Sequence, residues 1–322
     1  MDLARMLDKC VRDQWTIDDL DWSAAPPSLP RDKEEAVVQA FLDMAGIELL
    51  AAALFEVQRD KATDPTLREI FASFVIDERR HSAVALRLAQ HYDVHHYRPY
   101  VESPSLATFR PHFLEVVRNT SPEIANAYIT AGEMILDVAL LRSLDDYVDD
   151  EMSHRAMHLI NRDESRHIAI DFHMVEFYCS DAHLASIAAR PTMSARAAAR
   201  MYRNLATMMW HAKPFLHDVF LVPMDRTDPS GRRAREAFKR LQLLLRKPTV
   251  ARTPFPRFMI RMQELYNHPV IGKAFGPLLL RLLGAEDRAA RILFTGEDLA
   301  RTQHMSFDEL AEEALAVKYT QA

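Results

Sequence analysis

Two stretches of this 322-residue sequence repeat one pattern: Asp77-Glu78-Arg79-Arg80-His81 and Asp163-Glu164-Ser165-Arg166-His167. Both read Asp-Glu-x-Arg-His, and each follows a single glutamate in an apolar segment. Glu48 lies 30 residues before Glu78, and Glu133 lies 31 residues before Glu164. One glutamate followed by one Glu-x-x-His therefore occurs twice, which indicates an internal duplication.

The spacing within each motif brings two kinds of metal-binding side chain together. Residues three apart lie on one face of a helix, so Glu78 adjoins His81 and Glu164 adjoins His167. All of these residues lie on apolar stripes, and four buried carboxylates are costly unless they are neutralised. Two divalent cations would supply the four positive charges. The sequence therefore predicts a dimetal site with six ligands: Glu48, Glu78, His81, Glu133, Glu164 and His167.

The ligand types narrow the choice of metal. Oxygen-rich ligation with one imidazole per cation suits iron or manganese, whereas zinc sites usually contain fewer carboxylates. We expect two iron ions, with manganese or a mixed pair as alternatives. The alternative without metal is a pair of unrelated surface repeats joined by salt bridges. Glu151-x-x-His154 has the same spacing, but it lies about 15 Å before Glu164 on the same helix and is interpreted as a polar helix start.

The other charged residues of the two motifs are expected to support the ligands. A metal-bound histidine usually donates its second ring N–H to a carboxylate or a carbonyl. Asp77 and Asp163 are placed to accept that bond, each from the histidine across the centre. Arg80 and Arg166 could then balance and orient the two aspartates. Surface ion pairing is the alternative for both arginines.

The rest of the chain has the composition and the apolar spacing of a helical protein. Glycine is scarce, with 7 residues, and good helix formers are abundant. Apolar periodicity predicts four long helices near 31–61, 65–92, 122–149 and 150–179. A connection of roughly 25 residues separates the second from the third. The expected fold class is all-α: a ferritin-like four-helix bundle with one long crossover plus additional C-terminal helices.

We expect one domain in three parts. Residues 1–30 form an N-terminal arm, residues 31–180 form the bundle, and residues 181–322 form a helical extension packed on it. Within the extension, helices are predicted at Ser194–Phe220, with a kink at Pro214, and at Arg232–Arg246. The first of these could line an apolar substrate channel or form an ordinary core seam with Met201, Leu205, Met208, Met209 and His211.

Charge is distributed unevenly along the chain. The net charge is −6, yet residues 232–261 contain ten lysines and arginines and one acid, Glu236. This segment is either a solvated helix face or a dock for an acidic partner such as an acyl or peptidyl carrier protein. Nucleic acid is not expected as a partner, because the whole chain is acidic and contains no binding motif for it.

Several features bear on the location of the protein. The two cysteines, Cys10 and Cys179, match no disulfide framework or metal spacing. The N-terminus lacks an apolar signal core, and no uninterrupted apolar run approaches the ~20 residues of a membrane span. A cytoplasmic location is therefore expected.

At the residues named above, the chain resembles the ferritin-like di-iron carboxylate superfamily over residues 31–179. The Asp-Glu-x-Arg-His form is most similar to soluble bacterial multicomponent monooxygenases and acyl-carrier-protein desaturases. The resemblance implies bridging carboxylates and two iron ions, each with its own main ligand set: Glu48, Glu78 and His81, and Glu133, Glu164 and His167. It also implies an O₂-activating oxygenase or oxidase that hydroxylates, desaturates or N-oxidises a small or carrier-protein-bound substrate.

The chain departs from these relatives in three places. The p-aminobenzoate N-oxygenases have a further histidine where this chain has Ile160. The monooxygenases have a threonine where this chain has Asp137, which could be a catalytic proton shuttle or an uninvolved acid. Rubrerythrins add a cysteine-rich module that this sequence lacks, so electrons would come from a ferredoxin or a separate reductase.

Some alternatives stay open. Gly46, Ala52 and Gly132 could leave room for substrate beside the metals or could allow close helix packing. A rubrerythrin-like protein for iron handling or peroxide removal is the alternative function, and an interaction protein on an inert bundle is a third class. A homodimer is compatible with the sequence, which does not fix the oligomeric state.

Overall fold

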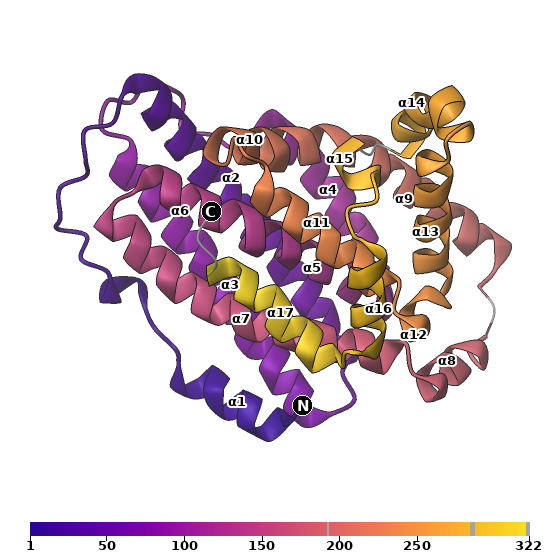
Figure 1. Ribbon diagram of the computed structural model, residues 1–322. Helices are drawn as coiled ribbons and strands as arrows, with labels where there is room; N and C mark the ends of the chain where they lie inside the picture. The colour runs from indigo at the N-terminus through magenta and orange to yellow at the C-terminus, as the bar shows by residue number, and fades with distance from the viewer. Residues whose placement is uncertain (192, 284–286, 320–322) are drawn as a thin grey trace.

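The computed structural model of the chain describes residues 1–191, 193–283 and 287–319. These residues form helices and connecting segments, and no strand occurs among them (Figure 1). The predicted all-α class is therefore confirmed for the described chain.

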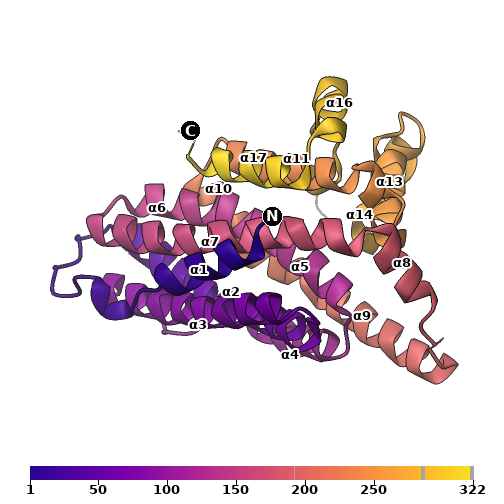
Figure 2. The same cartoon turned by 90° about the horizontal axis from the view of Figure 1, so that it is seen from below.

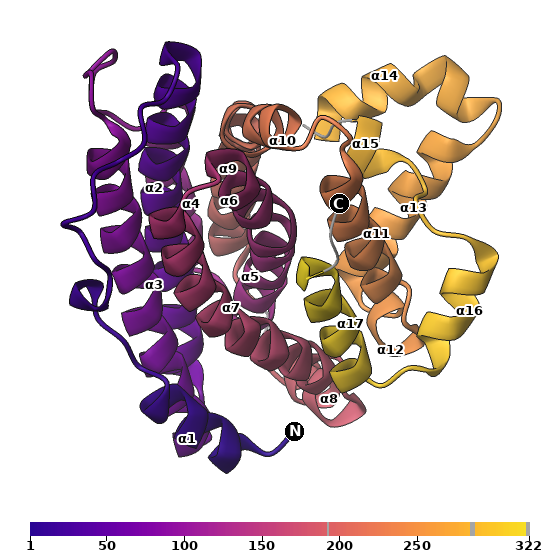
Figure 3. The ribbon, with the colours of Figure 1, turned by 60° about the vertical axis from the view of Figure 1, so that its left-hand side comes forward.

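Four long helical segments form the centre of the molecule. They are α2 (Arg31–Lys61), α3 (Pro65–Tyr92), α5 (Pro122–Ile135) with its continuation, and α7 (Glu151–Tyr178). α2 packs along α3, and α5 packs against both α2 and α7. Figure 3 shows these helices as two adjacent layers, α2 with α3 and α5 with α7. The predicted helices at 31–61 and 65–92 have these bounds in the structure.

Capping residues fix where these helices begin. The Asp64 side chain accepts hydrogen bonds from the backbone N–H groups of Thr66 and Leu67 at 2.8 and 3.0 Å, with Pro65 in the first helical position. Ser121 caps α5 in the same way, and Asp150 caps α7. These caps satisfy N–H groups that have no partner within the helix.

The third long helix is not uniform, contrary to expectation. α5 passes into a π-helical segment, Leu136–Leu141, before α6 (Arg142–Val148) completes it. π-Helical segments are rare and occur frequently at functional sites. This segment begins three residues after Glu133, so the irregularity lies next to a predicted ligand.

The connection between the second and third long helices is also different from the prediction, because it contains a helix. α4 (Pro104–Arg118) packs on α2 and on α9. α4 contains two prolines: Pro104 occupies the first helical turn, where proline is tolerated, and Pro111 lies inside the helix. Four apolar residues of α4 are buried at helical spacing: Leu106, Phe109, Phe113 and Val117.

Gly46 serves this contact with α4. A Cβ added at Gly46 would lie 2.7 Å from Leu106 Cδ2 and 2.8 Å from the Arg110 guanidinium. The residue therefore allows α2 and α4 to approach closely. The alternative of close packing holds at Gly46, and the prediction that it leaves room beside the metals is wrong.

The N-terminal arm crosses the surface of the two ligand-bearing layers. It contains α1 (Leu3–Arg12) and a short 3₁₀ turn, Ile17–Asp19. α1 contacts both α3 and α7, and Figure 2 shows it lying across this pair. The arm therefore packs on both of the helices that carry the repeated motifs.

The C-terminal extension adds a further layer. Its helices are α8 (Asp181–Ala188), α9 (Ala195–Phe215), α10 (Val222–Thr227), α11 (Arg232–Leu245), α12 (Pro248–Ala251), α13 (Pro254–Asn267), α14 (Ile271–Leu283), α15 (Asp287–Ala290), α16 (Gly296–His304) and α17 (Phe307–Tyr319). α17 packs on α7, and α11 packs on α5 (Figures 2 and 3). The expected kink at Pro214 takes the form of a second π-helical segment, Leu216–Leu221.

The predicted channel helix does not have the expected surroundings. The main contact of α9 is with α4. Met208 is buried, but Met201 is 37% exposed and Met209 is 40% exposed. His211 stacks on His112 of α4, with ring centroids 4.5 Å apart. The alternative of a helix seam therefore holds for Met208 and His211, which lie against α4 or the core, whereas Met201 and Met209 are partly exposed.

Much of the positive charge of residues 232–261 is used inside the molecule. Four of its cations pair with carboxylates from other elements: Arg233 with Asp146, Lys239 with Asp298, Arg240 with Glu313 and Arg252 with Asp181. Lys247 is buried, and its ammonium group donates to the carbonyl of Thr302 at 3.2 Å. The interpretation as a fully solvated face is therefore wrong for Arg233 and Lys247.

Two helices are long and apolar enough to cross a membrane by length and composition, Arg31–Lys61 and Pro122–Val148. Each helix contains acidic residues within its apolar stretch, so neither is an uninterrupted apolar run of the kind considered in the sequence. Of their most apolar windows, 78% and 67% are buried inside the structure. Core helices of soluble proteins meet the same criterion, so this is weak evidence for a membrane span.

Cys10 and Cys179 are both buried and unpaired.

Candidate metal centre

The structure brings the six predicted ligand residues together at the centre of the four long helices. α2 supplies Glu48 and α5 supplies Glu133, while α3 and α7 each supply a glutamate and a histidine. Each of the six side chains is at most 3% exposed. They fall into two groups, in each of which the potential ligand atoms lie within 4.8 Å of one another: Glu48, Glu78, His81 and Glu164, and Glu78, Glu133, Glu164 and His167.

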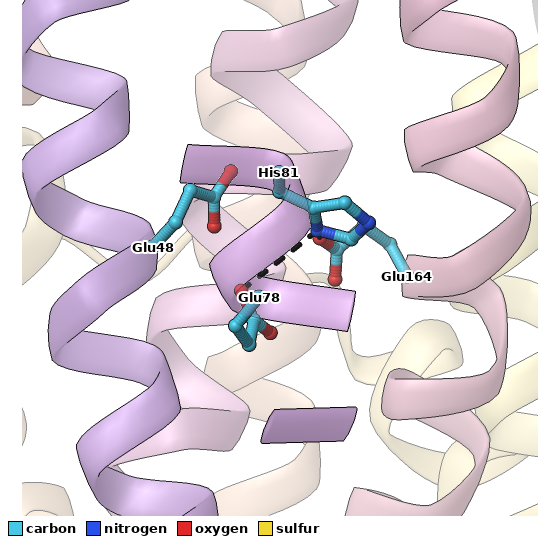
Figure 4. A group of neighbouring side chains, drawn as sticks. All are labelled: Glu48, Glu78, His81 and Glu164. Carbon is cyan, nitrogen blue, oxygen red and sulfur yellow. Dashed lines mark ion pairs between the residues drawn. The ribbon is translucent and has the colours of Figure 1, made fainter. Parts of the chain in front are cut away.

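Glu78 and Glu164 belong to both groups. His81 Nδ1 lies 2.9 Å from Glu164 Oε1 and 3.8 Å from Glu78 Oε2. His167 Nδ1 lies 3.1 Å from Glu78 Oε1 and 2.9 Å from Glu164 Oε2. Both histidines therefore direct Nδ1 at the same two carboxylates. Figure 4 shows the first group converging from α2, α3 and α7.

The cluster has the unsatisfied oxygens expected of a cation site. Among the described residues, no hydrogen bond reaches Oε1 of Glu48 or Oε2 of Glu133, and the Glu78 oxygens have only ion-pair contacts with the two histidines. Buried polar atoms without partners are rare in folded proteins and need an explanation. Cations would satisfy these oxygens and cancel their charge. The donor set therefore fits two divalent metal ions.

The pKa values of the four glutamates show that holding these carboxylates together without cations is unfavourable. Burial, with the charge of Glu164 second, raises the pKa of Glu48 to about 7. Burial and neighbouring carboxylates also raise the pKa of Glu78 and Glu133 well above the usual range. Burial would raise the pKa of Glu164 too, but the two histidines lower it well below its ordinary value. The four carboxylates therefore cannot all ionise unless positive charge compensates them.

The pKa values of the two histidines show that the imidazoles and the carboxylates compensate each other's charge. Burial alone would lower both values, but the surrounding carboxylates raise the pKa of His81 to about 10 and that of His167 to about 9. In the metal-free protein the imidazoles therefore carry protons that balance the glutamates. A bound cation would displace those protons.

The predicted supporting aspartates face the histidines across the centre. Asp163 Oδ2 lies 3.0 Å from His81 Nε2, and Asp77 Oδ2 lies 3.5 Å from His167 Nε2. Burial opposes ionisation of Asp163, yet bonds and charges from His81, Arg166 and Arg80 hold its pKa well below the usual range. An ionised aspartate at each Nε2 atom fixes the tautomer that leaves Nδ1 for a metal.

The two motif arginines join these aspartates. Arg80 pairs with Asp77 and lies 2.8 Å from Asp163, and Arg166 lies 2.7 Å from Asp163 and 3.3 Å from Asp77. Their side chains are 9% and 3% exposed. The alternative of surface ion pairing is therefore wrong for both arginines.

Sequence reasoning missed two side chains of the arm that reach this network. The indole N–H of Trp15 donates to Asp163 Oδ2 at 2.6 Å, and the Gln14 amide donates to Asp77 Oδ1 at 3.1 Å. Trp15 lies 148 residues from its partner, in a segment without apolar periodicity. No local pattern could have indicated this contact.

A third missed residue, Asp171, did carry a signal. It follows His167 by four residues and therefore continues the stripe of Glu164 and His167 on α7. It is fully buried, and within the described part of the chain neither of its carboxylate oxygens has a hydrogen-bond partner. A buried acid on the ligand stripe could have been recognised as part of the site.

The remaining predicted residues differ in their burial and in the space around them. Asp137 is fully buried in the π-helical segment one turn after Glu133. Ala52 is buried, and a Cβ added at Gly132 would meet no atom within 4 Å, so room exists at Gly132. His154 lies 2.9 Å from Asp145, which agrees with its interpretation as a polar helix start.

Apolar rings border the centre on the side of His167. The centroid of its ring lies 4.2 Å from that of Phe74 and 5.1 Å from that of Phe55. These rings exclude water from one side of the cluster. The site thus combines oxygen-rich potential ligands with an apolar wall on one side.

Comparisons with known proteins do not assign a family. No protein-family model matches the chain, and no curated protein matches it. The functional assignment therefore rests on the chemistry of the site.

Proposed function

We propose that this chain is a non-haem di-iron oxygenase or oxidase built on a ferritin-like four-helix bundle. The observation that carries the proposal is the sharing of Glu78 and Glu164 between two buried ligand groups. Glu78 and Glu164 would each help to hold both cations, and one imidazole for each group favours iron or manganese over zinc. When bound, a ferrous pair would relay electrons to O₂ and provide Lewis acidity.

The protein's own residues have three tasks in this proposal. The six ligand residues would hold the cations close together. Asp163 accepts a hydrogen bond from His81, and Asp77 forms an ion pair with His167 from the opposite motif. Phe55 and Phe74 keep one side of the centre dry. Asp137, one turn beyond Glu133 and fully buried, is the proposed proton shuttle.

The proposed substrate is a small organic molecule or an acyl or aminoacyl group on a carrier protein. Hydroxylation, desaturation and N-oxidation are all within the chemistry of such a site. In each of these reactions O₂ accepts four electrons. Two come from the substrate, and two come from a ferredoxin or a separate reductase. The basic residues of 232–261 that remain exposed are the proposed contact for an acidic carrier or electron donor.

Anaerobic metal loading tests the proposal. The full-length protein should retain two equivalents of ferrous iron, and exposure to O₂ should change its optical spectrum within one turnover. Glu78→Ala and Glu164→Ala should each retain fewer than two equivalents, because each removes a ligand shared by both groups. Fewer than two equivalents in the unaltered protein would overturn the proposal.

Glu34→Gln provides the matched control. Glu34 is also a buried glutamate of α2, 1% exposed, but it accepts hydrogen bonds from the backbone N–H and Nδ1 of His95 at 2.8 and 2.7 Å. It precedes Glu48 by 14 residues, about 21 Å along the helix. This variant should therefore retain two equivalents. Rapid peroxide removal without an organic substrate would instead favour the rubrerythrin-like alternative.

A further inference from the structure

The N-terminal arm contacts the two repeated motifs through different chemical groups. Trp15 is 6% exposed, and its indole N–H donates to Asp163 at 2.6 Å. Asp77, the aspartate of the other motif, accepts a hydrogen bond from the Gln14 amide at 3.1 Å. The arm thus places an aromatic donor on one half of the site and a side-chain amide on the other.

The Trp15 contact breaks the near symmetry of the network formed by the two aspartates and the two motif arginines. Arg80 and Arg166 each reach both aspartates. The bond from His81 Nε2 to Asp163 is 3.0 Å long, whereas His167 Nε2 lies 3.5 Å from Asp77. The shorter of the two contacts is the one whose acceptor is also held by the indole.

The surroundings of the two imidazoles differ in the same sense. The Trp15 ring stacks on His81 with centroids 6.4 Å apart and planes 25° apart, and the Arg80 guanidinium lies 4.8 Å from the Trp15 ring centroid. His167 instead contacts Phe55 and Phe74, which offer no hydrogen bond. Both imidazoles contact Glu164 through Nδ1 at 2.9 Å. Within the described residues, only His81 also has a hydrogen bond on its Nε2 side, to Asp163, whose carboxylate is held in turn by Trp15.

The arm itself is anchored, so it can hold Trp15 in place. Gln14 accepts a hydrogen bond from Arg80 at 2.7 Å and donates to the carbonyl of Cys10 at 2.8 Å. Arg162 of α7 donates to the carbonyl of Asp13 at 2.6 Å. Asp13 and Gln14, the two residues before Trp15, are thus hydrogen-bonded to α1, α3 or α7.

We propose that Trp15 is a positioning residue that makes the two metal positions unequal. The position formed by Glu48, Glu78, His81 and Glu164 then binds its cation first and more tightly than the position that includes Glu133 and His167. A ligand held in its binding orientation loses less freedom when the metal arrives. Groups that orient a ligating histidine typically change metal affinity about 10–100-fold. This inference rests on the proposed dimetal function.

Titration of the full-length metal-free protein with Co²⁺ under inert gas tests the inference. Two readouts are followed, the visible spectrum of bound Co²⁺ and the shifted N–H proton resonances of the ligating histidines. The unaltered protein should bind two equivalents in two steps, with one histidine N–H signal appearing in each. Trp15→Phe keeps an aromatic ring and removes the donor, so it should weaken the first step about 10-fold or more and bring the steps together at an unchanged total of two.

Trp22→Phe is the matched control, because Trp22 belongs to the same arm and its half-buried indole also donates a hydrogen bond and lies beside a guanidinium. Its indole donates to the Ile17 carbonyl at 2.8 Å, and the Arg87 guanidinium lies 5.0 Å from its ring centroid. This variant should leave both binding constants and both N–H signals unchanged. Trp15→His is the rescue variant, since its imidazole carries an N–H at the ring position that corresponds to the indole Nε1. It should restore the separation of the two steps.

The outcomes separate this inference from the proposed function. Two equivalents bound with equal constants, or two unchanged steps in Trp15→Phe, would overturn the inference and leave the dimetal site intact. Equal losses in Trp15→Phe and Trp22→Phe would also overturn it, because the arm would then act only as a cover. Should Trp15→Phe fail to fold, the Trp15→His titration decides between separated and merged steps. Fewer than two equivalents in the unaltered protein would contradict the proposed function itself.

Discussion

Asp163 and His81 lie 82 residues apart in the sequence, and Asp163 Oδ2 lies 3.0 Å from His81 Nε2. The aspartate of the second motif therefore supports the histidine of the first, and Asp77 faces His167 in return. Neither motif is complete alone, because each histidine depends on a carboxylate from the other helix. The crossed contacts join α3 and α7 at the level of the metal site.

Asp163→Asn tests this crossed support. The amide keeps the shape of the side chain but removes the negative charge that orients the imidazole N–H. We expect the affinity of the His81 position for Co²⁺ to fall about 10–100-fold, while the fold is retained. Equilibrium dialysis against Co²⁺ measures the change.

The control for this variant is Asp93→Asn. Asp93 lies 2.9 Å from His96 Nδ1, so it forms the same kind of pair, but His96 is exposed and outside the cluster. Metal affinity should be unaffected. An Asp163→Asn protein that binds as tightly as the unaltered one would show that the crossed contact has no effect on the metal.

The stability of the metal-free protein should decline as pH rises from 5 to 9. The pKa of Glu48 is raised to about 7 in the folded state, so its contribution is complete below pH 4.5 and is lost through pH 7. The pKa values of His81 and His167 are raised to about 10 and 9, so their contribution is complete below pH 6.5 and is lost above it. Asp163 and Glu164 have lowered pKa values, and their contributions are lost only in more acidic solution.

Metal loading should reverse this dependence, because a cation replaces the protons and binds more tightly as pH rises. The difference in Tm between loaded and metal-free protein should therefore widen from pH 5 to pH 9, as scanning calorimetry can measure. Glu48→Gln should flatten the decline of the metal-free protein around pH 7. A metal-free Tm that rises over this range would contradict the assignment of raised pKa values.

Asp137→Asn tests the proposed proton shuttle. The side chain is fully buried one turn after Glu133. Loss of a proton-transfer group typically slows turnover by about 10²-fold or more, while the number of bound metals should stay at two. Metal content and the rate of O₂ consumption are measured on the same samples. Loss of metal in this variant would assign Asp137 to the ligand set instead.

The ligand residues were accessible from the sequence because helix geometry links spacing to position. Glu78 and His81 must share a face if residues 65–92 are helical, and apolar neighbours indicate that this face is buried. α4 was missed because prolines are typical of loops, although proline is also tolerated in the first turn of a helix. The Trp15 contact was not accessible at all, since it depends on the path of an aperiodic arm across two helices.

The charge-rich segment shows a second limit of sequence reasoning. A run of lysines and arginines shows that negative charge must be near, but it does not show whether that charge belongs to solvent, to a partner or to the same chain. Arg233 and Lys239 find their carboxylates within the molecule, at Asp146 and Asp298. Only the tertiary structure distinguishes these cases.

Asp171→Leu should stabilise the metal-free protein. Asp171 is fully buried, burial raises its pKa well above the usual range, and no described residue provides a hydrogen-bond partner for its carboxylate oxygens. Leucine has nearly the same branched shape and removes the unsatisfied polar group. Since an unpaired buried polar group costs about 1–3 kcal/mol, the free energy of unfolding in urea should rise by about that amount.

Asp43→Leu makes the opposite prediction and provides the control. Asp43 is also a buried aspartate of a central helix, 3% exposed, but the backbone N–H and the hydroxyl of Ser103 donate to it at 2.7 and 2.5 Å. Its replacement leaves those donors unpaired and should destabilise the protein by about 1–3 kcal/mol. If both variants lose stability, Asp171 has a partner that stabilises it in solution. If only Asp43→Leu does, the acid at position 171 is kept at a cost in stability, as expected of a residue that serves the site.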